Sequence, residues 1–99
     1  MAERLAAGAR DAALPALKAA SWAHIPERDA LKKTFRFKNF INAWSWMSAV
    51  ALEAEKMDHH PEWTNVYGTV EVTLTTHDAN GLTRLDLELA RKMDTLAQR

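Results

Sequence analysis

The fold of this chain is constrained most by two segments in which apolar and polar residues alternate. A helical pattern separates them. In residues 31–37 the apolar side chains fall on one side of an extended chain and most of the polar ones on the other. Residues 69–76 repeat the pattern, with Val70, Val72 and Leu74 alternating with polar residues. Period-two alternation with one apolar face is typical of strands in a sheet that helices cover. Both segments are therefore predicted to be strands of such a sheet.

Each of these strands is expected to pair with a shorter strand that precedes it. Trp22–Ile25 is predicted to be a short strand, joined by a turn at residues 26–29 to the first alternating segment. Trp63–Tyr67 precedes the second, with Gly68 at the turn. Two hairpins separated by a helix predict an α+β fold, with a four-stranded antiparallel sheet and three helices packed on one face. The length suits a single domain over residues 1–99.

The first and last helices follow from apolar residues at helical spacing. Residues 3–20 are rich in alanine and leucine, and Pro15 is expected to kink this helix or to restart it as a first-turn residue. Asn80-Gly81 is predicted to be a turn before the final amphipathic helix. The apolar positions of that helix are Leu82, Leu85, Leu89, Met93 and Leu96.

The long central helix carries more apolar surface than one sheet can cover. Asn39 is predicted to cap it, and it should run from Phe40 to about Met57. One apolar stripe consists of Phe40, Trp44, Met47, Ala51 and Ala54. At 100° per residue, Trp46, Val50 and Met57 form a second zone, roughly 80–120° away from the first. Contact with another subunit would cover this second zone, and so would packing of the first helix; the pattern favours neither.

Composition argues against several classes of function. The 13 basic and 13 acidic residues cancel, so electrostatic capture of nucleic acid or of an anionic membrane is not indicated. The chain has no cysteine, which excludes disulfides and thiolate sites. No apolar run is long enough to span a bilayer, and the first residues lack the apolar segment of a signal peptide. The expected location is the cytoplasm.

Three of the four histidines lie close together in the sequence. His59 and His60 are adjacent, and His77 follows the last predicted strand. Imidazole exchanges protons near neutral pH, so a cluster of three indicates acid–base chemistry. Glu55 lies four residues before His59, on the same face of a continuing helix, where its carboxylate would orient the imidazole and favour its protonated form. His77 is expected to approach the pair, because the strands that lead to it are hairpin neighbours.

Each of these features has a competing explanation. The histidine pair alone could be the end of a helix with two surface side chains. A metal site could draw on Glu55, Asp58 and the three histidines, but their spacing matches no compact ligand motif, so no metal is expected.

Two residues near the cluster also have a structural interpretation beside the functional one. Thr83 with Asp86 three residues later resembles a capping box, so Asp86 is either a helix cap or a site residue. Trp63 is either a core residue or a flat platform that stacks on an aromatic heterocycle.

Several runs of residues around the histidines form a recognisable set. They are Glu55-Lys56-Met57-Asp58-His59-His60-Pro61-Glu62-Trp63, Asn65-Val66-Tyr67, Thr75-Thr76-His77-Asp78, and Gly81-Leu82-Thr83 with Asp86. Together they resemble the pterin-4a-carbinolamine dehydratases. The resemblance extends upstream through Trp22, Arg28-Asp29 and Phe35–Phe40, so it covers nearly the whole chain, although the first twenty residues match only in helical character.

The resemblance implies a cofactor-free hydro-lyase. Its substrate would be a 4a-hydroxytetrahydropterin, which loses water to give quinonoid dihydropterin during the recycling of tetrahydrobiopterin for aromatic amino acid hydroxylases. By the family pattern, His59, His60 and His77 share the acid and base roles, Glu55 orients His59, and Asp86 lies near the site. The implied pterin-binding residues are Asp58, His59, His60, Thr75, Thr76, His77 and Asp78, with Trp63 as the candidate platform. Asp78 stands where some relatives carry glutamate.

The family also implies an assembly and a second function. Its members form one α+β domain and assemble as homodimers or homotetramers. Animal members additionally act as a dimerisation cofactor of a homeodomain transcription factor, which they bind through the long helix. A protein-binding module acting through that helix is therefore the alternative to an enzyme. A degenerate, inactive relative is disfavoured, because the full set of site residues is present.

Overall fold

The two alternating segments form the central pair of strands. The structure, a computed structural model that describes residues 2–98, pairs strand β2 (Ala30–Arg36) with strand β4 (Thr69–Leu74) in antiparallel register. Leu31 lies opposite Leu74, and Phe35 lies opposite Val70. All four side chains are buried, as expected for the apolar face of a half-covered sheet. Strands β1 (Ala23–Ile25) and β3 (Glu62–Val66) form the edges, so the strand order is β1-β2-β4-β3.

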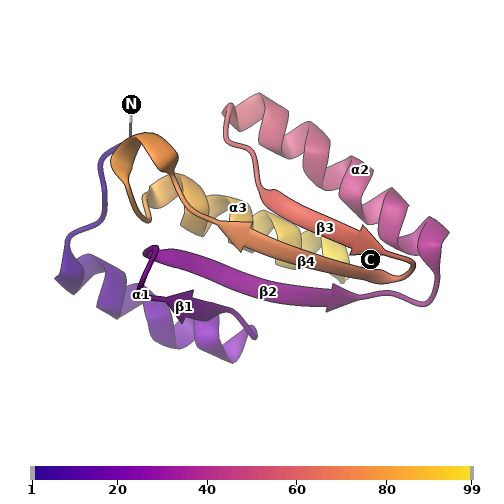
Figure 1. The fold of residues 1–99 in the computed structure, drawn as a ribbon, viewed down its shortest axis with the longest axis horizontal. Coiled ribbons are helices and arrows are strands. Elements are labelled where there is room, and N and C mark those ends of the chain that lie inside the picture. Colours follow the sequence, from indigo (N-terminus) through magenta and orange to yellow (C-terminus); the bar gives the residue numbers. More distant parts are fainter. Residues whose placement is uncertain (1, 99) are drawn as a thin grey trace.

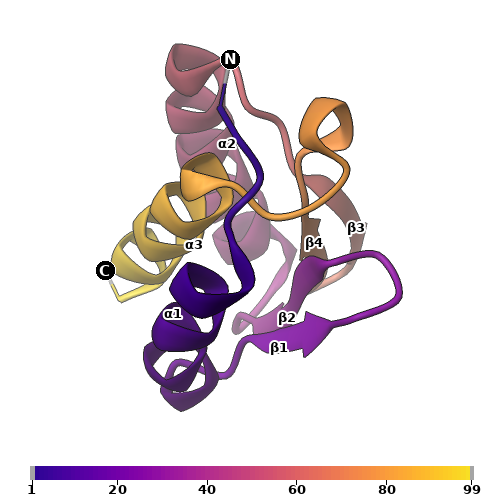
Figure 2. The ribbon, with the colours of Figure 1, turned by 90° about the vertical axis from the view of Figure 1, so that its left-hand side faces the viewer.

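Three helices cover one face of this sheet. They are α1 (Ala7–Ala19), α2 (Phe40–Met57) and α3 (Arg84–Ala97), and a short 3₁₀ helix, η1 (His77–Ala79), follows β4 (Figure 1). Figure 2, turned by 90°, shows α1, α2 and α3 on the same side of the sheet. The predicted α+β fold, with its four antiparallel strands and three helices on one face, is confirmed. No helix within residues 2–98 is both long and apolar enough to cross a membrane.

Most helices and strands begin and end within a few residues of the positions predicted from the sequence. The side chain of Asn39 accepts a hydrogen bond from the backbone N–H of Asn42 at 2.9 Å, which confirms it as the cap of α2. Helix α1 begins at Ala7 and continues through Pro15, so the proline does not restart it. Tyr67, predicted to end a strand, adopts a left-handed conformation (φ 51°) in the β3–β4 turn.

Trp46 and Val50 are buried within the chain, so the expected contact of these two residues with another subunit is wrong. The Trp46 ring lies 4.4 Å from that of Phe35 and 5.1 Å from that of Phe37, between centroids. Its indole N–H donates to the backbone oxygen of Met93 on α3 at 3.1 Å. The sheet and α3 therefore cover Trp46, where packing of the first helix had been the alternative to another subunit. The pattern of α2 alone could not reveal this, because it does not say which neighbour each stripe meets.

The first apolar stripe of α2 is only partly buried. Met47 and Ala54 belong to the core, whereas Phe40 and Trp44 are exposed. Ile41 and Leu52 are exposed as well. The uncovered apolar surface of α2 is thus centred on Trp44 rather than on Trp46.

Gly68 is required by a close approach between two segments. A Cβ at this position would lie 2.5 Å from the backbone oxygen of Phe37, where β2 leads into α2.

We expect Gly68→Ala to lower the free energy of unfolding by about 1–3 kcal/mol, the usual cost of overpacking. Gly8→Ala is the matched control, because a Cβ at Gly8 meets nothing within 4 Å and helix α1 favours alanine over glycine by about 0.5–1 kcal/mol. Urea denaturation of both variants measures the difference, and equal effects would contradict this explanation.

Candidate functional site

Three of the four histidines, His59, His60 and His77, lie in the segments next to the start of β3 and the end of β4. Figure 1 shows this end of the sheet. Helix α2 ends near this end of the sheet, and α3 starts there, with η1 between β4 and α3. Three chain segments therefore supply the site: the residues after α2, the loop after β4, and the first turn of α3. The predicted approach of His77 to the pair is confirmed to the extent that all three histidines line one cavity.

The end of α2 separates the two adjacent histidines. Asp58 adopts a left-handed conformation (φ 50°), its N–H bonds to the oxygen of Glu55, and the N–H of His59 bonds to the oxygen of Ala54 at 3.1 Å. This pair of bonds is a Schellman motif, which terminates a helix and turns the chain away from its axis. As a result the His59 side chain is 8% exposed, whereas that of His60 is 58% exposed.

His59 is bound to Asp86, a fully buried carboxylate. The distance from His59 Nε2 to Asp86 Oδ1 is 2.6 Å. The other carboxylate oxygen accepts from the Thr76 hydroxyl at 2.8 Å and from the backbone N–H of Thr83 at 2.9 Å. The Thr83 side chain in turn accepts from the N–H of Leu85 at 3.2 Å, so the predicted capping box is confirmed. Asp86 is therefore both the cap of α3 and a partner of a site histidine.

The prediction that Glu55 pairs with His59 is wrong. Glu55 Oε1 lies 2.8 Å from Nε2 of His60 instead. The prediction assumed a continuing helix, in which residues four apart share a face. Because Asp58 leaves the helical conformation, the chain turns and brings the fifth residue to the carboxylate.

His77 is paired with Glu62, a contact that sequence reasoning missed. Glu62 Oε2 lies 2.9 Å from His77 Nε2. The Arg28 guanidinium donates two hydrogen bonds to the same carboxylate, at 2.9 and 2.8 Å. Arg28 is the main reason that the pKa of Glu62 falls from 4.5 to about 2; burial opposes this shift and the His77 ring supports it. Glu62 and Arg28 both belong to the runs that carry the family resemblance, but no periodicity or spacing in the sequence gave either of them a role.

A surface cavity of about 780 Å³ joins these groups. The predicted pterin-binding residues that line it are Asp58, His59, His60, Thr75, Thr76, His77 and Asp78. Trp63 does not line it; its ring packs against the core, with its centroid 6.2 Å from that of Trp46. Its contact with a ligand stays a prediction. Glu62 lines the cavity, whereas Glu55 and Asp86 support its histidines from outside the lining.

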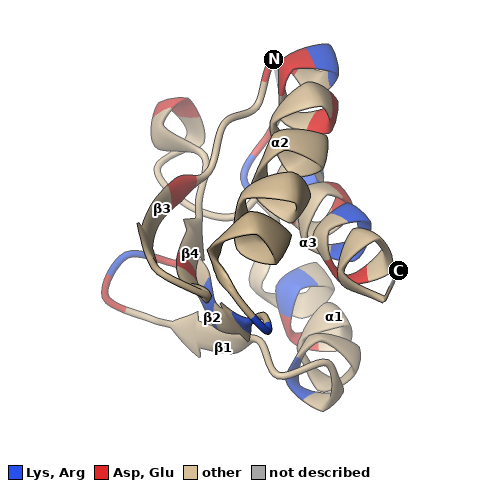
Figure 3. Ribbon diagram, turned by 90° about the vertical axis from the view of Figure 1, so that its right-hand side faces the viewer, with Lys and Arg blue, Asp and Glu red and all other residues tan. Residues whose placement is uncertain are grey.

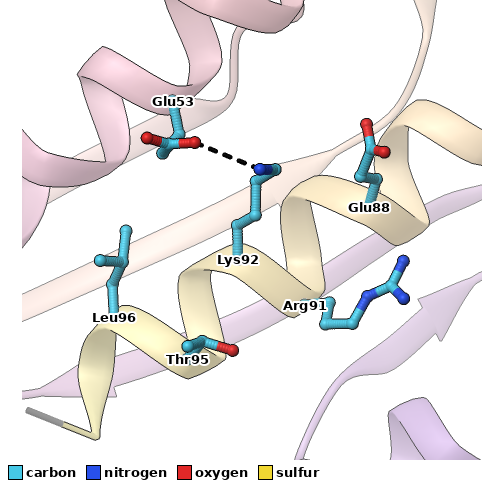
Figure 4. Close-up of a pocket in the computed structure, with 6 residues that line it drawn as sticks. All are labelled: Glu53, Glu88, Arg91, Lys92, Thr95 and Leu96. Carbon is cyan, nitrogen blue, oxygen red and sulfur yellow. Dashed lines mark hydrogen bonds and ion pairs between the residues drawn. The ribbon is translucent and has the colours of Figure 1, made fainter.

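A second hollow, between α2 and α3, lacks this chemistry. It measures about 490 Å³, and its lining has no histidine (Figure 4). The lining residues are Glu53, Glu88, Arg91, Lys92, Thr95 and Leu96. Its main contact is an ion pair between Lys92 and Glu53 at 3.2 Å. The described histidines near one another line the other cavity and not this one, so the cavity with the histidines is the candidate site. Within residues 2–98, no group of three or more acidic or histidine side chains converges as metal ligands would.

Comparison with known proteins finds relatives over nearly the whole chain. Residues 3–96 match the family model described as Pterin 4 alpha carbinolamine dehydratase. The chain belongs to the pterin-4a-carbinolamine dehydratase family. One relative of this dehydratase-family chain comes from Jannaschia sp. (strain CCS1) and is named "Putative pterin-4-alpha-carbinolamine dehydratase"; it is 59% identical over 98 residues, covering 99% of this chain and 100% of the relative. A protein of the same name from Roseobacter denitrificans is 56% identical over 97 residues, covering 98% and 99%.

Solved structures agree with the family fold. The crystal structure of a transcriptional coactivator/pterin dehydratase from Brucella melitensis superposes with a TM-score of 0.89 at 46% identity, covering 96% of this chain and 99% of that one. A pterin dehydratase-like protein described as a RuBisCO assembly factor in the alpha-carboxysome gives a TM-score of 0.68 at 23% identity, over 77% and 88% of the two chains. At that identity the second likeness shows the fold alone.

Replacing Asp86 tests how the buried network of this dehydratase-family chain is held together. Asp86→Asn keeps the shape but replaces one of the two acceptor oxygens with an NH2 group, so we expect the free energy of unfolding to fall by about 1–3 kcal/mol. Asp78→Asn is the matched control, since Asp78 is exposed and a surface change usually stays within about 0.5 kcal/mol. Urea denaturation measures both. An Asp86→Asn protein as stable as the control would show that the network contributes no stability.

Proposed function

We propose that this protein dehydrates 4a-hydroxytetrahydropterin to quinonoid dihydropterin and water. The observation that carries the proposal is a single cavity lined by three histidines, each hydrogen-bonded to its own carboxylate, in a member of the dehydratase family. The physiological role that fits this reaction is the recycling of tetrahydrobiopterin after aromatic amino acid hydroxylation.

The reaction needs two proton transfers, and the cavity offers groups for both. The 4a-hydroxyl leaves as water only if an acid protonates the oxygen while the carbon–oxygen bond breaks, and a base must accept the proton of the ring nitrogen. His60 and His77 are exposed and free to meet a substrate, whereas His59 is buried against Asp86. In this proposal His60 and His77 exchange protons with the pterin, and His59 fixes the cavity wall. Acid–base groups suffice, so the proposal needs no metal or cofactor.

The pterin itself is proposed to lie between two backbone segments. Asp58–His60 and Thr75–Asp78 line the cavity from opposite chain segments, the first after α2 and the second after β4. Thr76 is anchored by Asp86 and Thr83, so this wall is held in place before the substrate arrives. A preformed wall lowers the cost of orienting a rigid heterocycle.

Histidine variants test the proposed chemistry. We expect His60→Ala and His77→Ala each to lower the dehydration rate by roughly 10²-fold or more, the usual effect of losing a positioned acid or base. His24→Ala is the matched control, because His24 is the fourth histidine and lies outside the cavity. The assay follows 4a-hydroxytetrahydropterin with the spontaneous reaction subtracted. Near-normal rates in both site variants, with the fold intact by circular dichroism, would refute the proposal.

The exposed face of α2 supports a proposal about assembly. Phe40, Ile41, Trp44 and Leu52 are 45%, 63%, 53% and 67% exposed. Figure 3 shows no charged residue along most of α2, with colour only near its C-terminal end. Burying exposed apolar surface in a contact stabilises that contact by about 25 cal/mol per Å². We propose that this face mediates self-association into a homodimer or homotetramer.

The same face carries the alternative function, a protein-binding module. The Brucella relative is described as a transcriptional coactivator as well as a pterin dehydratase, which favours keeping this alternative. Dehydration depends on the histidines, whereas binding of a partner protein would depend on Trp44 and its neighbours on α2. The two functions can therefore be separated by substitution.

A charged residue in place of Trp44 tests the assembly. We expect Trp44→Glu to shift the protein toward smaller species, because a buried carboxylate without a partner opposes association. Val66→Glu is the control, since Val66 is an exposed apolar residue on the edge strand β3. Light scattering after size-exclusion chromatography gives the masses. A wild-type mass of one 11.2 kDa chain at every concentration would refute the oligomer, and dissociation by Val66→Glu alone would place the contact at the sheet edge.

A further inference from the structure

Glu62 joins two hairpins at the edge of the cavity. It is the first residue of β3, and its carboxylate contacts His77 after β4 and Arg28 in the β1–β2 turn. Arg28 is 34 residues away in the sequence and binds both carboxylate oxygens. A two-bond Arg–carboxylate contact fixes the plane of the carboxylate as well as its position. Arg28 therefore orients the carboxylate whose Oε2 atom also contacts His77.

The turn that carries Arg28 is itself rigidly fixed. The neighbouring Asp29 is buried, and its carboxylate accepts from the N–H of Leu82 at 3.1 Å and from Arg4 at 3.0 Å. Its backbone oxygen accepts from the Thr75 hydroxyl at 3.2 Å. A Cβ at Gly81 would lie 2.5 Å from Asp29 Oδ2, so the loop after η1 packs directly on this turn. Arg28 therefore extends from a support tied to the same loop that carries His77.

The contact also decides which ring nitrogen of His77 is free. The pKa of Glu62 is lowered to about 2, mainly by Arg28, so the carboxylate is ionised at neutral pH and can only accept hydrogen bonds. The Nε2 atom that faces it must carry a hydrogen. Among the described residues, no hydrogen bond reaches Nδ1 of His77.

We propose that Glu62, held by Arg28, is a positioning residue that fixes the His77 ring in its Nε2–H form, so that His77 exchanges its proton with the substrate through Nδ1. This inference rests on the proposed dehydration for the identity of the substrate. In the reaction, Nδ1 takes or gives the proton while Nε2–H stays on Glu62, and the carboxylate stabilises the imidazolium whenever both nitrogens are protonated. Glu62 acts through His77 and needs no contact with the pterin.

His77 differs in this respect from His60. The partner of His60 is Glu55, an exposed carboxylate for which the described residues provide no cation comparable to Arg28. Glu62 is instead shared between the Arg28 guanidinium and the ring. Two variants therefore separate the effect of the Glu62 charge from that of the paired hydrogen bonds. Glu62→Gln removes the charge of the carboxylate but keeps its shape, and Arg28→Lys keeps the positive charge but removes the pair of hydrogen bonds.

The first test needs no substrate. In protein labelled with ¹⁵N in the histidine rings, NMR spectra of neutral imidazoles report which nitrogen carries the hydrogen. We expect His77 to be more completely in the Nε2–H form than a histidine in a short unstructured peptide. Glu62→Gln should move the ratio to that of the peptide, because an amide presents either a donor or an acceptor. Arg28→Gln should move it part of the way, and Arg28→Lys less.

Two results of this experiment would overturn the proposal. One is a wild-type His77 with the tautomer ratio of the peptide, and the other is a ratio unchanged by Glu62→Gln. Glu53→Gln is the matched control, since Glu53 is also a carboxylate shared between two cations, Lys56 and Lys92, but it lies outside the cavity. A His77 ratio that responds equally to Glu53→Gln would also overturn the proposal.

The second test asks whether Glu62 acts through His77. Glu62→Gln should lower kcat by less than the roughly 10²-fold expected for loss of His77, with KM nearly unchanged. In the His77→Ala background the same substitution should have no further effect, because the group that it positions is gone. Additive losses would contradict a positioning role. A protein without dehydratase activity would refute the proposed function alone, because the NMR test of His77 would still stand.

Discussion

The buried carboxylate of Asp86 is the interaction on which the rest of the site depends. A carboxylate without water is costly unless donors surround it, and here a ring nitrogen, a hydroxyl and a backbone N–H do so. These donors come from the segment after α2, the loop after β4 and the N-cap of α3. No buried side-chain nitrogen or oxygen within the described residues lacks a partner. The cap and site roles of Asp86 are thus one arrangement, because satisfying the carboxylate also aligns the three segments.

Each histidine contacts a carboxylate, and these carboxylates range from buried to exposed. Each of the four, His24 included, directs Nε2 toward a carboxylate. His59 has a buried partner, His77 has a partner fixed by Arg28, and His60 has an exposed partner on the last turn of α2. In the proposed reaction, a carboxylate beside each ring would stabilise the imidazolium that proton transfer creates. The site would then carry positive charge without water supplying all of the compensation.

The fold could be read from the sequence because its signals are local. Alternation in residues 31–37 and 69–76, the Asn39 cap and the Thr83–Asp86 capping box each depend on a few neighbouring residues. The failures are non-local or depend on a single backbone angle. Asp58 in the left-handed region moves Glu55 from His59 to His60.

Two further features required contacts between distant segments. Trp46 is covered by α3, whose position is set by the whole core rather than by the pattern of α2. The contact of Arg28 with Glu62 joins residues on separate hairpins, so no spacing in the sequence could reveal it. The candidate histidines were therefore predictable, whereas the carboxylates that hold them were only partly so.

Turnover of authentic 4a-hydroxytetrahydropterin by the purified wild-type protein is the most direct measurement of the proposed function. With protein at a small fraction of the substrate concentration, we expect the carbinolamine to disappear well above its spontaneous rate, in proportion to protein and over many turnovers, with quinonoid dihydropterin as the product. A decay that matches buffer alone at every concentration of folded protein would contradict the assignment of this cavity as a dehydratase site.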